Sequence, residues 1–190
     1  FNATSNYGRA DKFEKMEECL QELRKLHDAH PEKEVRENLA SGLVNATSNY
    51  GRADKFEKME ECLQELRKLH DAHPEKEVRE NLAKGLFNAT NHLGDRDGGY
   101  ENLFLLFVLR FDLPDDSNRE RFIKGIEDLV IKETIKIVED KYKEGEEHLA
   151  EFIDLMKAET ENQTEVVLLL DKISEKLDFK VQKKLWELLT

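Results

Sequence analysis

Cysteine, proline and glycine are all scarce in this sequence. Its 190 residues include two cysteines, three prolines and nine glycines. Two cysteines are too few for the disulfide frameworks of small secreted domains, so we expect a reducing, cytoplasmic location. The low proline and glycine content excludes collagen-like and low-complexity chains, which are rich in one or both residues. A folded protein with few helix-breaking residues is therefore expected.

Long apolar runs and an excess of basic residues are also missing. No stretch approaches the roughly 18 apolar residues of a membrane-spanning helix, so no membrane association is expected. Lys and Arg number 30 against 42 Asp and Glu, which gives a net charge of −12. Nucleic acid is bound through basic surfaces and is a poor partner for such a chain. A basic protein or peptide would be attracted instead.

What the sequence does contain is a long internal repeat. Residues 2–40 recur without a single change as residues 45–83, so the period is 43 residues, and a diverged third copy follows. Asn2, Asn45 and Asn88 each open the tripeptide Asn-Ala-Thr at this spacing. A fold tolerates changes on its surface, so perfect identity indicates a very recent duplication or a deliberate engineering step.

Each repeat has the pattern of two amphipathic helices. In residues 54–96, two apolar stripes recur at spacings of three and four, which is the helical period. The first stripe contains Phe56, Met59, Leu63, Leu66 and Leu69, and the second contains Val78, Leu82, Leu86 and Ala89. Gly42 and Gly85 fall inside the second helix of their repeats. Because glycine weakens a helix, we expect a neighbouring helix to approach closely at both positions.

The helix ends are also predicted from the residues that flank them. Asp54 with Glu57 fits an N-terminal capping box, and Pro74 suits the first position of the following helix. Gly51 is expected to be the left-handed residue that ends the preceding helix. These residues predict a short turn, His70–His73, between the two helices of a repeat.

The region after Gly94 follows a different pattern but remains helical. Residues 100–113 predict a helix that is buried on most sides, and Ser117 with Glu120 predicts the start of a helix reaching about Tyr142. Further helices are expected near 146–157, 164–176 and 179–189. Trp186 is expected to pack inside this terminal group.

The second helix of each repeat resembles the third helix of an armadillo repeat. The stretch from Pro31 through Leu39 to Asn45 has that helix's spacing, with its opening proline at Pro31 and Pro74. The period also falls in the range of HEAT and armadillo arrays. The resemblance implies that Asn45 and Asn88 are the family's helix-end asparagine, which lines a concave groove and hydrogen-bonds an extended peptide. The family's groove tryptophan is replaced by Ser41 and Lys84, and its two short first helices are one helix here, as in HEAT repeats.

The fold class that follows is all-α, an α-α superhelix or armadillo/HEAT-like solenoid of about four two-helix repeats. We expect residues 1–190 to form one domain. It would comprise a partial repeat 1–10, repeats 11–53 and 54–96, a diverged repeat 97–143 and C-terminal capping helices 144–190. The incomplete first repeat would expose apolar surface and could support a homodimer.

Neither catalysis nor metal binding is predicted. Cys19 and Cys62 occupy equivalent places in duplicated helices, and packed helices lie too far apart for the two thiols to form a disulfide. His27 and His30, repeated as His70 and His73, have no evident third ligand and are expected to be surface-loop histidines. No cofactor is expected.

Two functions remain open. In the first, the chain is a non-enzymatic scaffold that binds a protein or peptide on its concave face. The residues expected to line that face are Glu37, Ser41, Asn45, Glu80, Lys84 and Asn88. In the second, it is an engineered or recently duplicated structural repeat with no ligand of its own.

Overall fold

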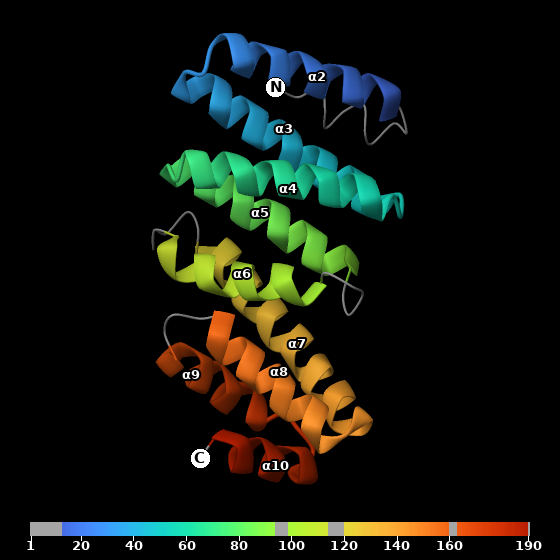
Figure 1. The fold of residues 1–190 in the computed structure, drawn as a ribbon, viewed down its shortest axis with the longest axis vertical. Helices are drawn as coiled ribbons and strands as arrows, with labels where there is room; N and C mark the ends of the chain where they lie inside the picture. Colours follow the sequence, from blue (N-terminus) through green and yellow to red (C-terminus); the bar gives the residue numbers. More distant parts are fainter. Residues whose placement is uncertain (1–12, 94–98, 114–119, 160–162, 190) are drawn as a thin grey trace. The chain divides into compact units, whose positions relative to one another are not determined.

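In the computed structural model, all regular secondary structure is helical over the residues that the structure describes, which are 13–93, 99–113, 120–159 and 163–189 (Figure 1). No strand occurs in these ranges, and this confirms the all-α prediction. The helices are α2 (Phe13–Ala29), α3 (Lys33–Arg52), α4 (Phe56–Ala72), α5 (Lys76–Leu93), α6 (Gly99–Asp112), α7 (Glu120–Glu144), α8 (Glu146–Glu159), α9 (Gln163–Ser174) and α10 (Phe179–Leu189). The chain forms two compact units.

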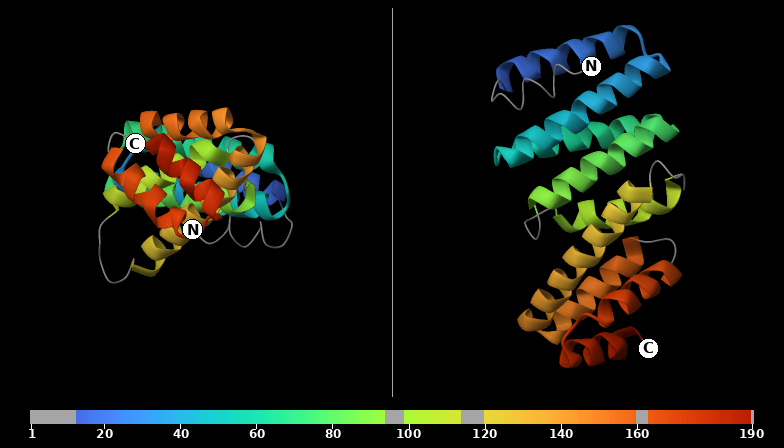
Figure 2. Two further views of the ribbon diagram at one scale, coloured as in Figure 1. Left: turned by 90° about the horizontal axis from the view of Figure 1, so that it is seen from below. Right: turned by 180° about the vertical axis from the view of Figure 1, so that it is seen from behind.

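The first unit contains the two copies of the repeat. Helices α2 and α3 form the first copy and α4 and α5 the second, and α3 packs against α2, α4 and α5. Within this unit α2 and α4 lie on the side that faces the reader in Figure 1. Helices α3 and α5 face the reader in the reverse view on the right of Figure 2. Each copy is therefore a helix pair that packs beside the next pair.

The core of this unit is built from the apolar stripes that the sequence predicts. Equivalent side chains are buried in both copies, including Met16 and Met59, Leu20 and Leu63, Leu39 and Leu82, and Leu43 and Leu86. The mid-helix glycines confirm the predicted close approach. A Cβ atom at Gly42 would lie 2.8 Å from Cδ1 of Leu23 on α2, and one at Gly85 would lie 2.8 Å from Cδ1 of Leu66 on α4.

The predicted helix ends are wrong in detail. Helix α3 continues through Gly51 to Arg52, and the left-handed residue is Asp54, whose φ is 55°. Asp54 therefore cannot cap α4, which begins after Lys55 without a side-chain cap. Gly51 instead serves packing, because a methyl group there would collide with the ring of His92.

The loop between the helices of a repeat is also shifted from its predicted place. Helix α4 runs on to Ala72, so most of the expected turn His70–His73 is helical. Pro74 precedes the first helical residue, Lys76, by two positions and so does not hold the first helical position. Pro31 stands in the same relation to Lys33. Both prolines lie in the short connection, where their missing N–H removes no helical hydrogen bond.

The second unit consists of α7 to α10 with residues 103–108 of α6. These helices confirm those expected near 100–113, 120–142, 146–157, 164–176 and 179–189. The burial of Leu103, Phe104, Leu106 and Phe107 confirms a helix covered on most sides, and the Phe104 ring lies 5.7 Å from that of Phe152 on α8. The proposed cap residue Ser117 lies outside the described residues. No helix in the described ranges is long and apolar enough to cross a membrane.

Candidate functional site

The six residues predicted to line a binding face occupy the outward sides of α3 and α5. Glu37, Ser41 and Asn45 follow one another at intervals of four on α3, so they share one face of that helix. Their equivalents on α5 are Glu80, Lys84 and Asn88, and all six are partly exposed. Because α3 and α5 pack against each other, the two rows form neighbouring parts of one surface.

The same surface includes residues that the sequence reasoning did not assign to it. Val44 and Ser48 on α3, with Phe87 and Asn91 on α5, lie three or four residues from the predicted members and are at least partly exposed. We call the combined surface the α3/α5 strip. Its members are Glu37, Ser41, Val44, Asn45, Ser48, Glu80, Lys84, Phe87, Asn88 and Asn91. The helical spacing from Ser41 and Lys84 was the signal that could have identified the additional four.

The carboxylates of the strip are held by ion pairs that differ between the copies. Glu37 lies 3.5 Å from the Nζ of Lys33, one turn earlier on α3. Glu80 instead accepts a hydrogen bond of 2.8 Å from Lys84, the residue that replaces Ser41. The Lys84 side chain remains 42% exposed, whereas Glu80 is 16% exposed. The second copy thus presents a cation where the first presents a small hydroxyl group.

The two asparagines keep their amides available. Neither Asn45 nor Asn88 makes a side-chain hydrogen bond within the described part of the chain, whereas the neighbouring Asn91 donates to the carbonyl oxygen of Phe87 at 2.9 Å. A side-chain amide has two donors and one acceptor oxygen, which match a peptide group. The helix-end position implied by the armadillo resemblance is wrong, because α3 continues to Arg52 and α5 to Leu93.

The first differences between the copies all fall on this strip. After a run of identical residues, Ser41 is replaced by Lys84, Val44 by Phe87 and Ser48 by Asn91. The intervening buried residues are unchanged, as in Leu43 and Leu86. Over residues 41–48 the change is confined to one side of the second helix, and only after them do buried residues differ, with Asn49 replaced by His92 and Tyr50 by Leu93. A surface that varies on a constant core is typical of binding repeats.

Cys62 is poorly placed for nucleophilic chemistry. Both cysteines are free thiols, as predicted, and Cys62 is 3% exposed. Burial raises the pKa of Cys62 to about 12, so the thiol stays protonated at neutral pH. The reactive form of a cysteine is the thiolate, and Cys62 therefore lacks it.

Two of the four repeat histidines, His27 and His70, are more buried than the sequence suggested, whereas His30 follows α2 and is 62% exposed, as expected. His27 and His70 were expected in surface loops, but they lie in the last turns of α2 and α4 with side chains 20% and 19% exposed. Their Nδ1 atoms face Asp28 at 3.9 Å and Asp71 at 3.8 Å. No group of three potential metal ligands occurs among the residues that the structure describes.

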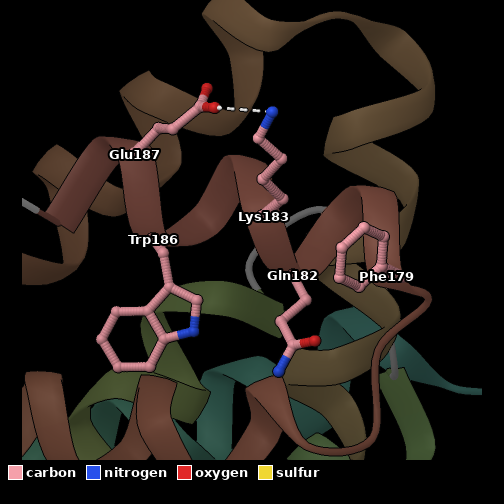
Figure 3. Close-up of a pocket in the computed structure, with 5 residues that line it drawn as sticks. All are labelled: Phe179, Gln182, Lys183, Trp186 and Glu187. Carbon is pink, nitrogen blue, oxygen red and sulfur yellow. Dashed lines mark ion pairs between the residues drawn. The ribbon is translucent and has the colours of Figure 1, made fainter.

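A second surface feature lies on α10 in the other unit. Phe179, Gln182, Lys183, Trp186 and Glu187 line an open hollow along one helix (Figure 3). Lys183 and Glu187 pair at 3.7 Å along its edge. Phe179 is 76% and Trp186 is 37% exposed, so the expectation that Trp186 packs inside the terminal helices is wrong. The inward side of α10 is supplied by Val181 and Leu185.

No protein-family model, curated protein or solved structure matches this chain. The chemistry of its own surfaces is therefore the basis for assigning a function.

Proposed function

We propose that this chain is a non-enzymatic scaffold that binds a protein or an extended peptide through the α3/α5 strip. The observation that carries the proposal is the location of the first three copy differences, at Ser41, Val44 and Ser48, which all change the strip while the buried residues between them stay the same. Under this proposal the helix pairs continue as an armadillo/HEAT-like α-solenoid, and the strip lies on its concave face.

The chemistry of the strip suits an extended peptide. Asn45 and Asn88 lie on adjacent helices with amides that can donate to and accept from a peptide backbone. Val44 and Phe87 supply apolar contact area between the polar residues. Glu37 and Glu80 are already paired with Lys33 and Lys84, so the preference for a basic peptide rests on the net charge of −12 of the whole chain.

The test uses a library of random peptides selected on the full chain. Peptides that bind are then measured against a variant with Asn45→Ala and Asn88→Ala. Loss of two backbone hydrogen bonds should weaken binding by roughly tenfold or more, at about 1 kcal/mol for each bond. The melting temperature should change little, because neither amide bonds the described part of the protein.

A matched control comes from the opposite side of the same unit. Gln21→Ala and Gln64→Ala remove two exposed amides from α2 and α4, and should leave affinity unchanged. If the asparagine variant melts much lower and binds equally well, the amides are structural and the strip is not the binding face. If selection yields no peptide, the alternative of a structural repeat without a ligand is the better account.

A further inference from the structure

The two identical copies differ in how their side chains are covered. Leu26 on α2 is 45% exposed, whereas the equivalent Leu69 on α4 is 7% exposed. Cys19 and Val35 are likewise partly exposed, while their equivalents Cys62 and Val78 are buried. The sequences are the same over this range, so the difference comes from what packs on each copy. The second copy has the first as its neighbour on this side.

Three ion pairs between the copies all have the same polarity. Arg24 on α2 pairs with Glu65 on α4 at 2.8 Å, and Lys33 on α3 pairs with Glu77 at the start of α5 at 3.2 Å. Arg36 on α3 also pairs with Glu75 just before α5. In all three pairs the first copy provides the cation and the second provides the carboxylate.

The first copy carries the same three carboxylates without these partners. The equivalents of Glu65, Glu75 and Glu77 are Glu22, Glu32 and Glu34, and all three are exposed. Glu22 and Glu34 pair with no described residue, and Glu32 faces only His30, at 3.9 Å. We define the outer face of the first copy by these glutamates together with Cys19, Leu26 and Val35.

We propose that the outer face of the first copy is a docking surface for one further helix pair of the same 43-residue sequence. That unit would pair its own equivalents of Arg24, Lys33 and Arg36 with Glu22, Glu34 and Glu32, respectively. It would also cover Leu26 and Cys19 as the first copy covers Leu69 and Cys62. The proposal is independent of the function assigned to the α3/α5 strip.

Charge favours this occupant over a symmetric dimer of the chain. Two outer faces placed against each other would oppose three glutamates with three glutamates, which is repulsive. A second whole chain also lacks an open set of the required cations. Its Arg67, the equivalent of Arg24, is already engaged by Asn102 and lies 3.8 Å from Glu60.

The experiment inserts one further unit, with the sequence of residues 2–44, in register before residue 2 of the full chain. Cys62→Ala and a Cys-to-Ala change in the inserted unit leave Cys19 as the only thiol. Its rate of reaction with a maleimide is compared with that of Cys19 in the Cys62→Ala chain without an insert. We expect the inserted unit to slow the reaction by at least about tenfold, because a covered thiol reacts only through local opening.

A charge-reversed insert provides the matched control. In this insert, the equivalents of Arg24, Lys33 and Arg36 are all replaced by Glu. We expect Cys19 then to react as fast as in the chain without an insert. A gain in helical circular dichroism reports whether the insert folds. If Cys19 reacts with maleimide as fast with the original insert as without it, whether or not the insert folds, the proposal is wrong. Equal protection by both inserts would overturn the role of the three ion pairs.

Discussion

Arg24 of the first copy holds Glu65 of the second with two of its nitrogens, since Nε and Nη2 both lie within 3.0 Å of the Glu65 carboxylate. Nη1 of Arg24 also donates to Glu17 on its own helix at 3.0 Å. The arginine thus joins α2 to α4 across the repeat boundary. Planar two-point pairing with a carboxylate is the strongest common form of ion pair in proteins.

We predict a measurable coupling energy between these two residues. A double-mutant cycle with Arg24→Ala and Glu65→Ala, measured by denaturant unfolding, should give a coupling energy of about 1–2 kcal/mol. This energy is smaller than that of a fully buried pair, because both side chains are partly exposed. The exposed pair Lys58–Glu61, 2.6 Å apart, is the control and should show no measurable coupling. Equal coupling in the two pairs would contradict a specific link between the copies.

The mid-helix glycines give a second prediction, in which identical substitutions have different outcomes. Gly85→Ala places a methyl group 2.8 Å from Leu66, which is fully buried and has no room to move. Overpacking should outweigh the gain in helix propensity and destabilise the protein by about 1 kcal/mol. Gly42→Ala meets Leu23 at the same distance, but Leu23 is partly exposed and can turn away. It should be neutral or slightly stabilising in the same thermal-unfolding measurement.

Glu17 gives a prediction about acid stability. Burial raises its pKa, but hydrogen bonds from Arg24 at 3.0 Å and Tyr50 at 2.9 Å outweigh burial, so the pKa lies below its ordinary value of 4.5. A lowered folded-state pKa means that Glu17 stabilises the protein above about pH 4.5, and that this contribution is lost as the pH falls through the folded-state pKa.

We therefore expect Glu17→Gln to lower the denaturant midpoint at pH 7 and to flatten its decline as the pH falls from 4.5 through the lowered folded-state pKa. The equivalent Glu60→Gln is the control. Leu93 replaces Tyr50 in the second copy, and Arg67 lies 3.8 Å from Glu60. The same acid profile for both variants would show that Tyr50 and Arg24 do not set the behaviour of Glu17.

Trp186, the only tryptophan, allows a direct test of the surface of α10. Its 37% exposure predicts fluorescence that acrylamide quenches readily in the native state. Trp186→Ala should reduce the free energy of unfolding by about 1–2 kcal/mol, because the side chain is partly covered but is not in the core. Leu185→Ala, at the adjacent and fully buried position, should cost about 2–5 kcal/mol. A larger loss from the tryptophan substitution would show that the ring belongs to the core.

The helices were predictable because their signal is local. Apolar residues spaced by three and four identified α4 and α5 to within a few residues, and the helices expected after residue 100 also match α6 to α10 closely. The role of Gly51 was not predictable from local sequence, because the glycine lies inside α3 and makes room for His92, a residue of the next copy. The prediction that Trp186 packs inside the terminal helices failed for a similar reason. A large aromatic residue carries no local indication of which side of α10 is covered.

Part of the candidate site could also be predicted from the spacing of residues along a helix. Four-residue spacing placed Ser41 with Asn45 and Lys84 with Asn88 on one helix face, and the structure places these residues on partly exposed sides of α3 and α5. Val44 and Phe87 were not assigned to that face, because an apolar side chain is expected in a core. Their location requires knowledge of which neighbours pack on α3 and α5.

The last prediction compares α2 with α4, whose sequences are identical throughout. Identical sequence gives nearly identical intrinsic amide-exchange rates, so any difference in protection reports local structural stability. Helix α4 buries five residues and is covered by the first copy, whereas α2 buries only Met16 and Leu20. We expect amides in α2 to exchange at least about tenfold faster than their equivalents in α4. Peptides from the two helices have the same mass, so Gln21→Arg marks one copy at an exposed position, and Gln64→Arg repeats the measurement with the mark reversed. Equal exchange in both marked chains would mean that the outer face of the first copy is already covered in solution.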